Sequence, residues 1–297
     1  MIFINYYDEI KKELLNNEIT KMVKNYSINK SDLTTYYNIG KLLKEAGKHY
    51  GEGIIKEYSR RLTSEFGKGY TFTSLTRMKK FYNLIEKLAT VSQHLSYGHY
   101  VELLPYSDID KINYYIKIIE EQNLSVRELR ERIKNNEYER LDEETKKKLK
   151  TKEELKVPDL VKNPIRIRNT RGYNEISEKI LQKLILEDIP SFLKELGSGF
   201  SFIDNEYKIK IGDRYNYIDL LLFNIEYNCY AVIELKVTEL KKEHIGQIEF
   251  YMNYIDKNLK NINQNKTIGI IICKKENKYV IEYCSDDRII AREYELV

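Results

Sequence analysis

Two short apolar segments in the second half of the chain each contain charged residues where a buried strand would carry apolar ones. Asp219 lies in the segment 217–223, and Glu234 and Lys236 lie in the segment 230–237. Both segments are rich in β-branched, leucine and tyrosine residues and are bounded by turn-forming residues, which predicts two adjacent strands. Because alternate side chains of a strand point to the same face, Glu234 and Lys236 would share a face. A hairpin would bring both acids to neighbouring strands.

Two carboxylates and a lysine in this arrangement fit metal-assisted hydrolysis of a phosphodiester bond. A divalent ion lowers the pKa of a bound water and neutralises the charge that develops on the phosphoryl oxygens. Mg²⁺ keeps several waters, so Asp219, Glu234 and the Leu235 carbonyl would suffice as protein ligands, and Mn²⁺ would substitute for it. Lys236 would hold the attacking water or stabilise the charged transition state. Glu-x-Lys alone is equally typical of an exposed strand face with a weak ion pair, but the apolar surroundings of both acids favour the site.

The elements expected around these strands form an α/β module with a mixed sheet. A helix with apolar residues from Ile176 to Leu196 comes first, bent near Pro190. Strands are expected at about 207–211, 215–224 and 229–238, followed by a helix at about 242–257. The remaining strands are expected near 267–273, 278–284 and 288–294.

The first part of the chain, residues 1–140, has the spacing of apolar residues that is typical of helices. Glycines between residues 67 and 69 separate a helix that ends near Phe66 from one that begins near Thr71. A short turn between two helices is compatible with a helix-turn-helix. The second helix would leave Arg77, Lys79 and Lys80 outside its buried stripe as candidate nucleic-acid contacts. Residues 141–170 contain lysines and prolines without an apolar period, which indicates a linker between this helical domain and a domain over 171–297.

Composition places the chain among soluble globular proteins. The net charge of +4 comes from residues 1–140, which mildly favours nucleic-acid contact there. No apolar run approaches the ~20 residues that span a bilayer, and no signal peptide is recognisable, so a cytoplasmic protein without membrane contact is expected. Cys229, Cys273 and Cys284 lack C-x-x-C spacing and are expected to be reduced core thiols.

The ordered motifs of the chain resemble the PD-(D/E)XK nuclease superfamily, and within it the YhcG-like branch of bacterial proteins. In the second half the matching segments are 192–200, 217–223, 232–236, 246–251 and 268–273. In the first half they are Tyr37-Asn38-Ile39-Gly40-Lys41, Phe72-Thr73-Ser74-Leu75, Leu95-Ser96-Tyr97-Gly98-His99-Tyr100 and Ser125-Val126-Arg127-Glu128-Leu129. The resemblance covers nearly the whole chain and implies a restriction-endonuclease-like core behind an all-α domain.

The resemblance also implies roles for individual residues. Asp219, Glu234 and Lys236 take the places of the catalytic Asp, Glu and Lys, and Gln247 and Tyr251 match a Gln-x-x-x-Tyr pair beside the active site. Many of these nucleases add a helix-borne glutamate as a further metal ligand. Glu178 and Glu175 are the candidates here, because the position aligned by counting back from Gly197 holds Gln182 and Lys183 instead.

The leading hypothesis is a Mg²⁺-dependent endonuclease that hydrolyses DNA, with defence, restriction or recombination as its setting. RNA as the substrate and a homodimeric state are both left open. One alternative is a catalytically inactive nucleic-acid-binding or scaffold protein with a nuclease-like fold. Another is a protein–protein interaction module within a larger assembly.

Overall fold

The computed structural model describes residues 5–23, 28–88, 92, 94–151, 153, 155–156, 159, 161–283 and 286–297, and Cys284 lies outside these ranges. Two compact units make up the chain, Met1–Asn135 and Asn136–Val297. Within the described ranges, no helix is both long and apolar enough to cross a membrane.

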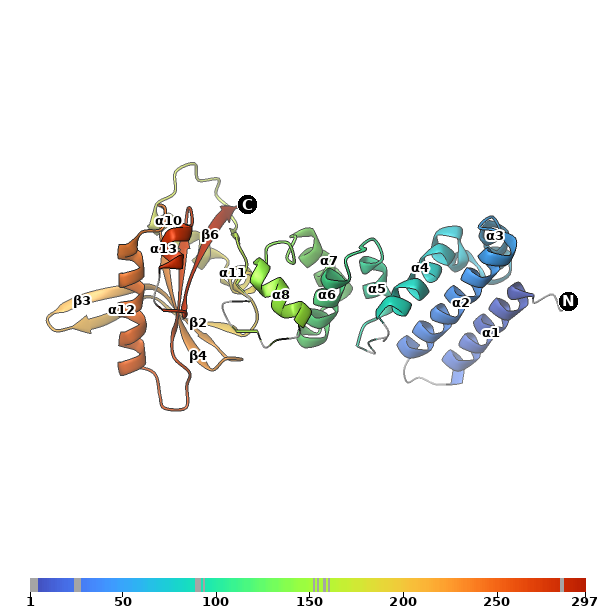
Figure 1. Cartoon of the computed structure of the whole chain (residues 1–297), viewed down its shortest axis with the longest axis horizontal. Coiled ribbons are helices and arrows are strands. Elements are labelled where there is room, and N and C mark those ends of the chain that lie inside the picture. Colours follow the sequence, from blue (N-terminus) through green and yellow to red (C-terminus); the bar gives the residue numbers. More distant parts are fainter. Residues whose placement is uncertain are drawn as a thin grey trace. The chain divides into compact units, whose positions relative to one another are not determined.

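The first unit is built of helices (Figure 1). Its elements are α1 (Tyr6–Val23), α2 (Ile28–Tyr50), α3 (Ile54–Phe66), the 3-10 turn η1 (Lys68–Tyr70), α4 (Phe72–Leu88), α5 (Tyr97–Leu103), α6 (Ile109–Gln122) and α7 (Val126–Lys134). Helices α1 to α4 share a core that includes Leu14, Leu43 and Leu75. Gly40 allows α2 to approach α4 closely, because a Cβ at this position would lie 2.3 Å from the Met78 carbonyl oxygen. A side chain at position 40 would therefore push the two helices apart.

The second unit is an α/β structure. Its strands are β1 (Ile165–Ile167), β2 (Phe200–Ile211), β3 (Arg214–Asn224), β4 (Cys229–Leu235), β5 (Ile268–Cys273) and β6 (Ile289–Leu296). In the described residues they form one six-stranded sheet in the order β1-β6-β5-β4-β3-β2. Strands β2, β3 and β4 are antiparallel neighbours, whereas β4, β5, β6 and β1 run parallel. The predicted mixed sheet and the predicted helical first part are thus confirmed.

Helices cover both faces of this sheet. Helices α10 (Glu178–Glu187) and α11 (Ile189–Leu196) pack on one face, in a core with Leu220, Leu222 and Ile233. Helix α12 (Lys242–Asn258) packs on the other face, in a core with Leu221, Val232 and Ile271. Alternate residues of β3 and β4 thus enter different cores, which is why both strands read as nearly continuous apolar runs. Cys229 and Cys273 are buried free thiols, as expected from the sequence.

The segment 141–170 is not a linker. It contains α8 (Glu143–Thr151) and β1, the strand that pairs with β6 at the edge of the sheet. Just before it, Arg140 donates hydrogen bonds to Glu195 on α11 at 2.5 and 3.2 Å, and one to the Pro164 carbonyl at 2.8 Å. The segment is therefore fixed to the sheet by buried polar contacts. The sequence did not indicate this role, because the segment is polar and strand β1 has only three residues.

The predicted strand at 278–284 is also wrong, since residues 278–282 form the short helix α13 (Lys278–Glu282). The Asn277 side chain accepts a hydrogen bond from the Val280 N–H and thereby caps this helix at its N-terminus. Tyr279 and Tyr283 leave 75% and 80% of their surface exposed. Tyrosine favours strands when its ring packs on a partly buried sheet surface, and these two rings have no such surface.

Candidate active site

The β3–β4 hairpin brings the two acidic residues together at one end of β4. Leu220 of β3 faces Ile233 of β4 in the antiparallel register, so Asp219 and Glu234 follow directly outside this pair. One carboxylate oxygen of Asp219 accepts a hydrogen bond from the Leu235 N–H at 2.7 Å. The Lys236 N–H donates to the Ile272 carbonyl at 2.8 Å and thus continues the contact with β5. The backbone of β4 therefore positions all three charged residues.

Glu234 and Lys236 are both buried and contact one another directly. The Lys236 ammonium lies 2.7 Å from Glu234 Oε1 and 3.6 Å from Glu178 Oε2. Only 2% of the Glu234 surface is exposed, and its second oxygen, Oε2, has no hydrogen-bond partner within the described residues. A buried carboxylate oxygen without a partner is costly, so this atom is suited to binding a ligand and does not belong to a closed salt bridge.

The electrostatics of the site favour a bound cation. Burial, and then the charge of Asp219, raise the pKa of Glu234 to about 7, although Lys236 acts against both. Burial likewise raises the pKa of Asp219, against the hydrogen bond from Leu235 and the charge of Lys236. Burial lowers the pKa of Lys236, but the hydrogen bond to Glu234 and the charges of Glu234, Glu178 and Asp219 together outweigh this effect, and the net shift is upward. One lysine thus compensates incompletely for the buried Glu234 and the partly buried Asp219, which leaves room for further positive charge.

The residues present fit a divalent ion that retains part of its water shell. Among the described residues, no three side chains of the His, Cys, Asp or Glu type are grouped so as to hold a metal. Asp219 and Glu234 would therefore be the protein carboxylates, with the Leu235 carbonyl and water completing the shell. Mg²⁺ is the ion that accepts this small a protein contribution, because it binds through one or two carboxylates and keeps several waters.

Of the two candidate helix glutamates, Glu178 contacts a residue of the site. Glu178 is the first residue of α10, and its side chain, 47% exposed, lies beside Lys236. Glu175 precedes α10 and is exposed. In the present arrangement Glu178 contacts the lysine, and its role as a metal ligand stays a prediction.

The role of Gln182 was not predicted from the sequence, in which Gln182 only occupies a position where the resemblance suggests a glutamate. Gln182 is buried on α10, one turn after Glu178, and its Nε2 donates a hydrogen bond to the Asp219 carbonyl at 3.0 Å. The amide thus ties the helix to the strand at the residue that carries the first acid. The only available signal was its spacing from Gly197.

Helix α12 contributes the predicted Gln–Tyr pair. Gln247 Nε2 donates a hydrogen bond to the Tyr251 hydroxyl at 3.2 Å. Burial raises the pKa of Tyr251, and the hydrogen bond from Gln247 lowers it by a smaller amount. The charges of Glu234 and Asp219 raise it further. Tyr251 therefore lies close enough to sense both acids. His244, in the first turn of the same helix, has a pKa lowered by burial and then by the charge of Lys236.

In the helical unit, the three predicted nucleic-acid contacts on α4 differ in their surroundings. Arg77 and Lys80 are exposed. The Lys79 ammonium is paired with Glu52 at 2.5 Å, and 18% of the Lys79 side chain is exposed. Nucleic-acid contact by the three residues stays a prediction. A turn between Gly67 and Thr71 joins α3 to α4, and a helix-turn-helix role for this pair stays a prediction.

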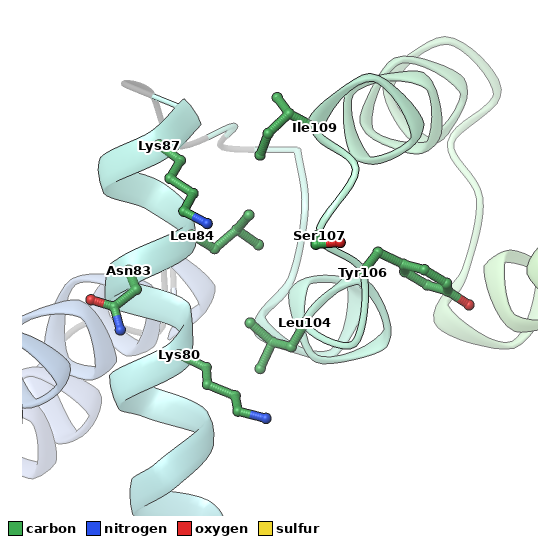
Figure 2. Close-up of a pocket in the computed structure, with 8 residues that line it drawn as sticks. All are labelled: Lys80, Asn83, Leu84, Lys87, Leu104, Tyr106, Ser107 and Ile109. Atoms are coloured by element: carbon green, nitrogen blue, oxygen red, sulfur yellow. The ribbon is translucent and has the colours of Figure 1, made fainter.

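A pocket of about 190 Å³ lies beside Lys80, between α4 and the segment that joins α5 to α6. Lys80 and Lys87 extend from α4 toward Leu104 and Ile109, while Leu84 lies between them (Figure 2). The remaining lining residues are Asn83, Tyr106 and Ser107. Two exposed lysines at the rim of a partly apolar pocket are a surface that an anionic ligand can contact.

Comparison with known proteins yields matches along both units. Residues 159–297 match the model of the YhcG PDDEXK nuclease domain, and residues 9–140 match the DUF1016 N-terminal domain. The Escherichia coli (strain K12) protein named "Putative nuclease YhcG" is 23% identical to this chain, over 91% of this chain and 84% of that protein. The two family models together account for nearly all of the chain.

Two solved structures are also similar to part of the chain. A repair endonuclease from Pyrococcus abyssi has a TM-score of 0.30 at 19% identity, over 41% of this chain and 48% of its own. A complex of EndoMS with dsDNA has a TM-score of 0.29 at 18% identity, over 43% of this chain and 48% of that one. Similarity this low leaves the family models and the site geometry as the basis for functional conclusions.

Proposed function

The chain belongs to the YhcG family of PDDEXK nucleases, and from this premise we propose that it is an endonuclease that hydrolyses DNA with Mg²⁺, which Mn²⁺ can replace. Nucleases of the PD-(D/E)XK type generally use divalent metal ions. The observation that carries the proposal is the cluster of the partly buried Asp219 with the buried Glu234 and Lys236, in which one carboxylate oxygen of Glu234 has no partner among the described residues.

Each residue of the cluster has a task in this reaction. A bound divalent ion supplies an activated water and neutralises charge on the phosphate. Asp219 and Glu234 would hold the ion, and the Leu235 N–H fixes the orientation of the Asp219 carboxylate through a hydrogen bond of 2.7 Å. The protonated Lys236 orients the water or stabilises the negative charge that develops during in-line attack on phosphorus. Gln247 and Tyr251 border the same space and would orient the scissile phosphate through hydrogen bonds.

The helical unit would bind the DNA backbone. Exposed cations contact phosphates without regard to sequence, and each contact releases counterions. Arg77, Lys80 and Lys87 lie at intervals of three and seven residues along α4, which places them on one side of the helix. Binding by this unit would hold DNA while the second unit cuts it.

Cleavage of supercoiled plasmid tests the proposal. Wild-type protein with Mg²⁺ or Mn²⁺ is expected to nick or linearise the plasmid, and EDTA is expected to stop the reaction. Glu234→Gln and Asp219→Asn, which preserve shape but remove charge, are expected to abolish it. Glu243→Gln and Asp213→Asn are matched controls, because both residues are exposed and lie outside the cluster.

Folded wild-type protein that leaves duplex, single-stranded and branched DNA intact with either ion would refute the proposed activity. If the same protein still bound DNA in a salt-dependent manner, the binding-protein alternative would take its place. The direct pairing of Lys236 with Glu234 is the observation that favours that alternative.

A further inference from the structure

The hairpin of β2 and β3 carries a row of lysines and tyrosines that no step of the reaction uses. Lys210 faces Tyr215 and Lys208 faces Tyr217 in the antiparallel register, so the four side chains share one face. Ile209 and Ile218 point to the other face, where both are fully buried in the core beneath α12. The hairpin extends past α12, away from the rest of its unit (Figure 1).

Both tyrosines are exposed to an extent that is unusual for aromatic residues within a sheet. Tyr215 and Tyr217 leave 51% and 52% of their surface accessible. The Lys208 ammonium lies 3.8 Å from the centre of the Tyr215 ring, and that of Lys210 lies 6.0 Å from it. The side chain of Tyr217 forms no hydrogen bond or ring contact with any part of the chain that the structure describes. Lys208 thus lies over the Tyr215 ring, and the face offers the ring surface that stays exposed together with two ammonium groups.

Charge alone does not explain what this face would attract. Asp204, Glu206, Asp213 and Asp219 lie on the same hairpin and outnumber Lys208, Lys210 and Arg214 by one. A hairpin without an excess of positive charge has no strong attraction for a phosphate backbone as such. Recognition would depend on the two rings, with the adjacent ammonium groups supplying local contacts to phosphate.

The spacing of the rings selects unstacked bases. Residues two apart on a strand are separated by about 7 Å, which is roughly twice the 3.4 Å between successive bases of a stacked strand. Bases that stacked on Tyr215 and Tyr217 would therefore have to be separated from one another. A base-paired duplex cannot open in this way without losing its own stacking, whereas an unpaired strand can.

The position of the rings links them to the cluster of acids. Tyr217 precedes Asp219 by two residues on β3, so the rings lie on the same strand as the first acid proposed to hold the ion. We propose that this face binds an unpaired, single-stranded stretch of DNA next to the phosphate that is cut. The inference rests on the proposed function only for the identity of the nucleic acid and for the position of the cut.

Equilibrium binding in EDTA tests the inference without any requirement for cleavage. The probe is a fluorescein-labelled oligodeoxythymidylate, measured by fluorescence anisotropy beside a labelled blunt duplex. Removal of both rings in Tyr215→Ala/Tyr217→Ala is expected to weaken single-strand binding by about 10- to 100-fold, in line with the loss of base–aromatic stacking. Duplex affinity is expected to change less than about twofold, because a closed duplex offers no free base face.

Two control variants define the result. Tyr215→Phe/Tyr217→Phe keeps the rings and is expected to retain wild-type affinity for the single strand. Tyr279→Ala/Tyr283→Ala removes two tyrosines that are even more exposed, one in α13 and one at its end, and is expected to have no effect. Thermal melts establish that all three variants are folded.

An unchanged affinity of the Ala variant for the single strand, or an equal loss for strand and duplex, would overturn the inference. Equal binding of single-stranded RNA that also depends on the rings would overturn the assignment to DNA. A protein that shows the expected single-strand binding but cuts nothing would contradict the proposed nuclease activity alone. Conversely, cleavage by a protein whose tyrosines can be removed without effect would contradict only the present inference.

Discussion

The side-chain amide of Gln182 on α10 holds the backbone carbonyl of Asp219 on β3 at 3.0 Å. This contact joins the helix to the strand at Asp219, the first acid of the cluster. Glu178, one turn earlier on the same helix, lies within 3.6 Å of Lys236. The N-terminal part of α10 therefore affects both an acid and the lysine, and its placement controls the geometry of the site.

Gln182→Leu removes this hydrogen bond at nearly constant volume. We expect cleavage to fall about tenfold through kcat, with little change in KM, because Asp219 would lose its fixed orientation but DNA contacts would remain. The free energy of unfolding should fall by about 1 kcal/mol. Isothermal titration with Mn²⁺ should show weaker binding, which a purely structural role would not cause. Lys183→Met, on the exposed side of the same helix, is the control, and equal effects of both substitutions would exclude a positioning role for Gln182.

The raised pKa of Glu234 predicts the pH dependence of stability. Its value is about 7 in the folded protein against 4.5 as its ordinary value. Between these values the unfolded chain has released the proton while the folded protein keeps it. Stability without metal should therefore fall as the pH rises from about 4.5 to about 7, by about 1.4 kcal/mol for each unit of difference in pKa.

Urea unfolding at a series of pH values in EDTA measures this effect. Glu234→Gln should reduce the slope, because a neutral amide stands in for the protonated acid. Mg²⁺ at pH 8 should stabilise the wild type but not the variant, and cleavage should increase through pH 7 as the carboxyl loses its proton. A wild-type stability that rises over the same pH interval would contradict the assigned direction of the pKa shift.

Two adjacent lysines of α4 provide a test of DNA contact by the helical unit. Lys80 is exposed beside the pocket, whereas Lys79 is paired with Glu52. Lys80→Gln removes one cation that would neutralise a phosphate, so it should lower the magnitude of the slope of log K against log salt by about 0.9. Lys79→Gln should leave that slope unchanged. Salt titrations of duplex binding measure both, and an effect of Lys79 equal to that of Lys80 would speak against the ion pair as the distinguishing feature.

The buried pair of Arg140 and Glu195 predicts a large effect on stability. Burial raises the pKa of Glu195, but the hydrogen bond from Arg140 and the charge of Lys162 outweigh it, so the net pKa is lowered. Glu195→Ala would leave the Arg140 guanidinium without its bidentate partner, and we expect a loss of about 3–5 kcal/mol in urea unfolding. Glu187→Ala, which breaks a largely exposed pair with Arg171, should cost at most about 1 kcal/mol. Equal losses in the two variants would show that the Arg140 contact is not a buried one.

The parts of the fold that sequence could predict are those specified by local patterns. The two strands with Asp219 and Glu234 were predictable because continuous apolar runs indicate strands buried on both faces. Helix α12 was predictable from its apolar spacing and α4 from the glycines before it. Strand β1 was not, because three residues carry too little pattern, and because its partner β6 lies more than 120 residues away in sequence.

Within the site, sequence could name the acids and the lysine but not their contacts. The adjacency of Glu178 and Lys236, and that of Gln182 and Asp219, depend on how α10 packs against the sheet. Packing of this kind is determined by the core around Leu181 and Leu184, not by the polar residues themselves. The exposed row of Tyr215 and Tyr217 likewise depends on which face of the hairpin α12 covers.

The pairing of β1 with β6 has a consequence for any fragment of the second unit. A fragment that began at residue 171 would lack β1 and leave β6 as the outermost strand, with its N–H and C=O groups free to pair with another molecule. Unprotected outer strands promote self-association. We therefore expect a fragment over 171–297 to aggregate at concentrations where one over 136–297 stays monodisperse, because the three residues of β1 shield the sheet from a second copy of itself.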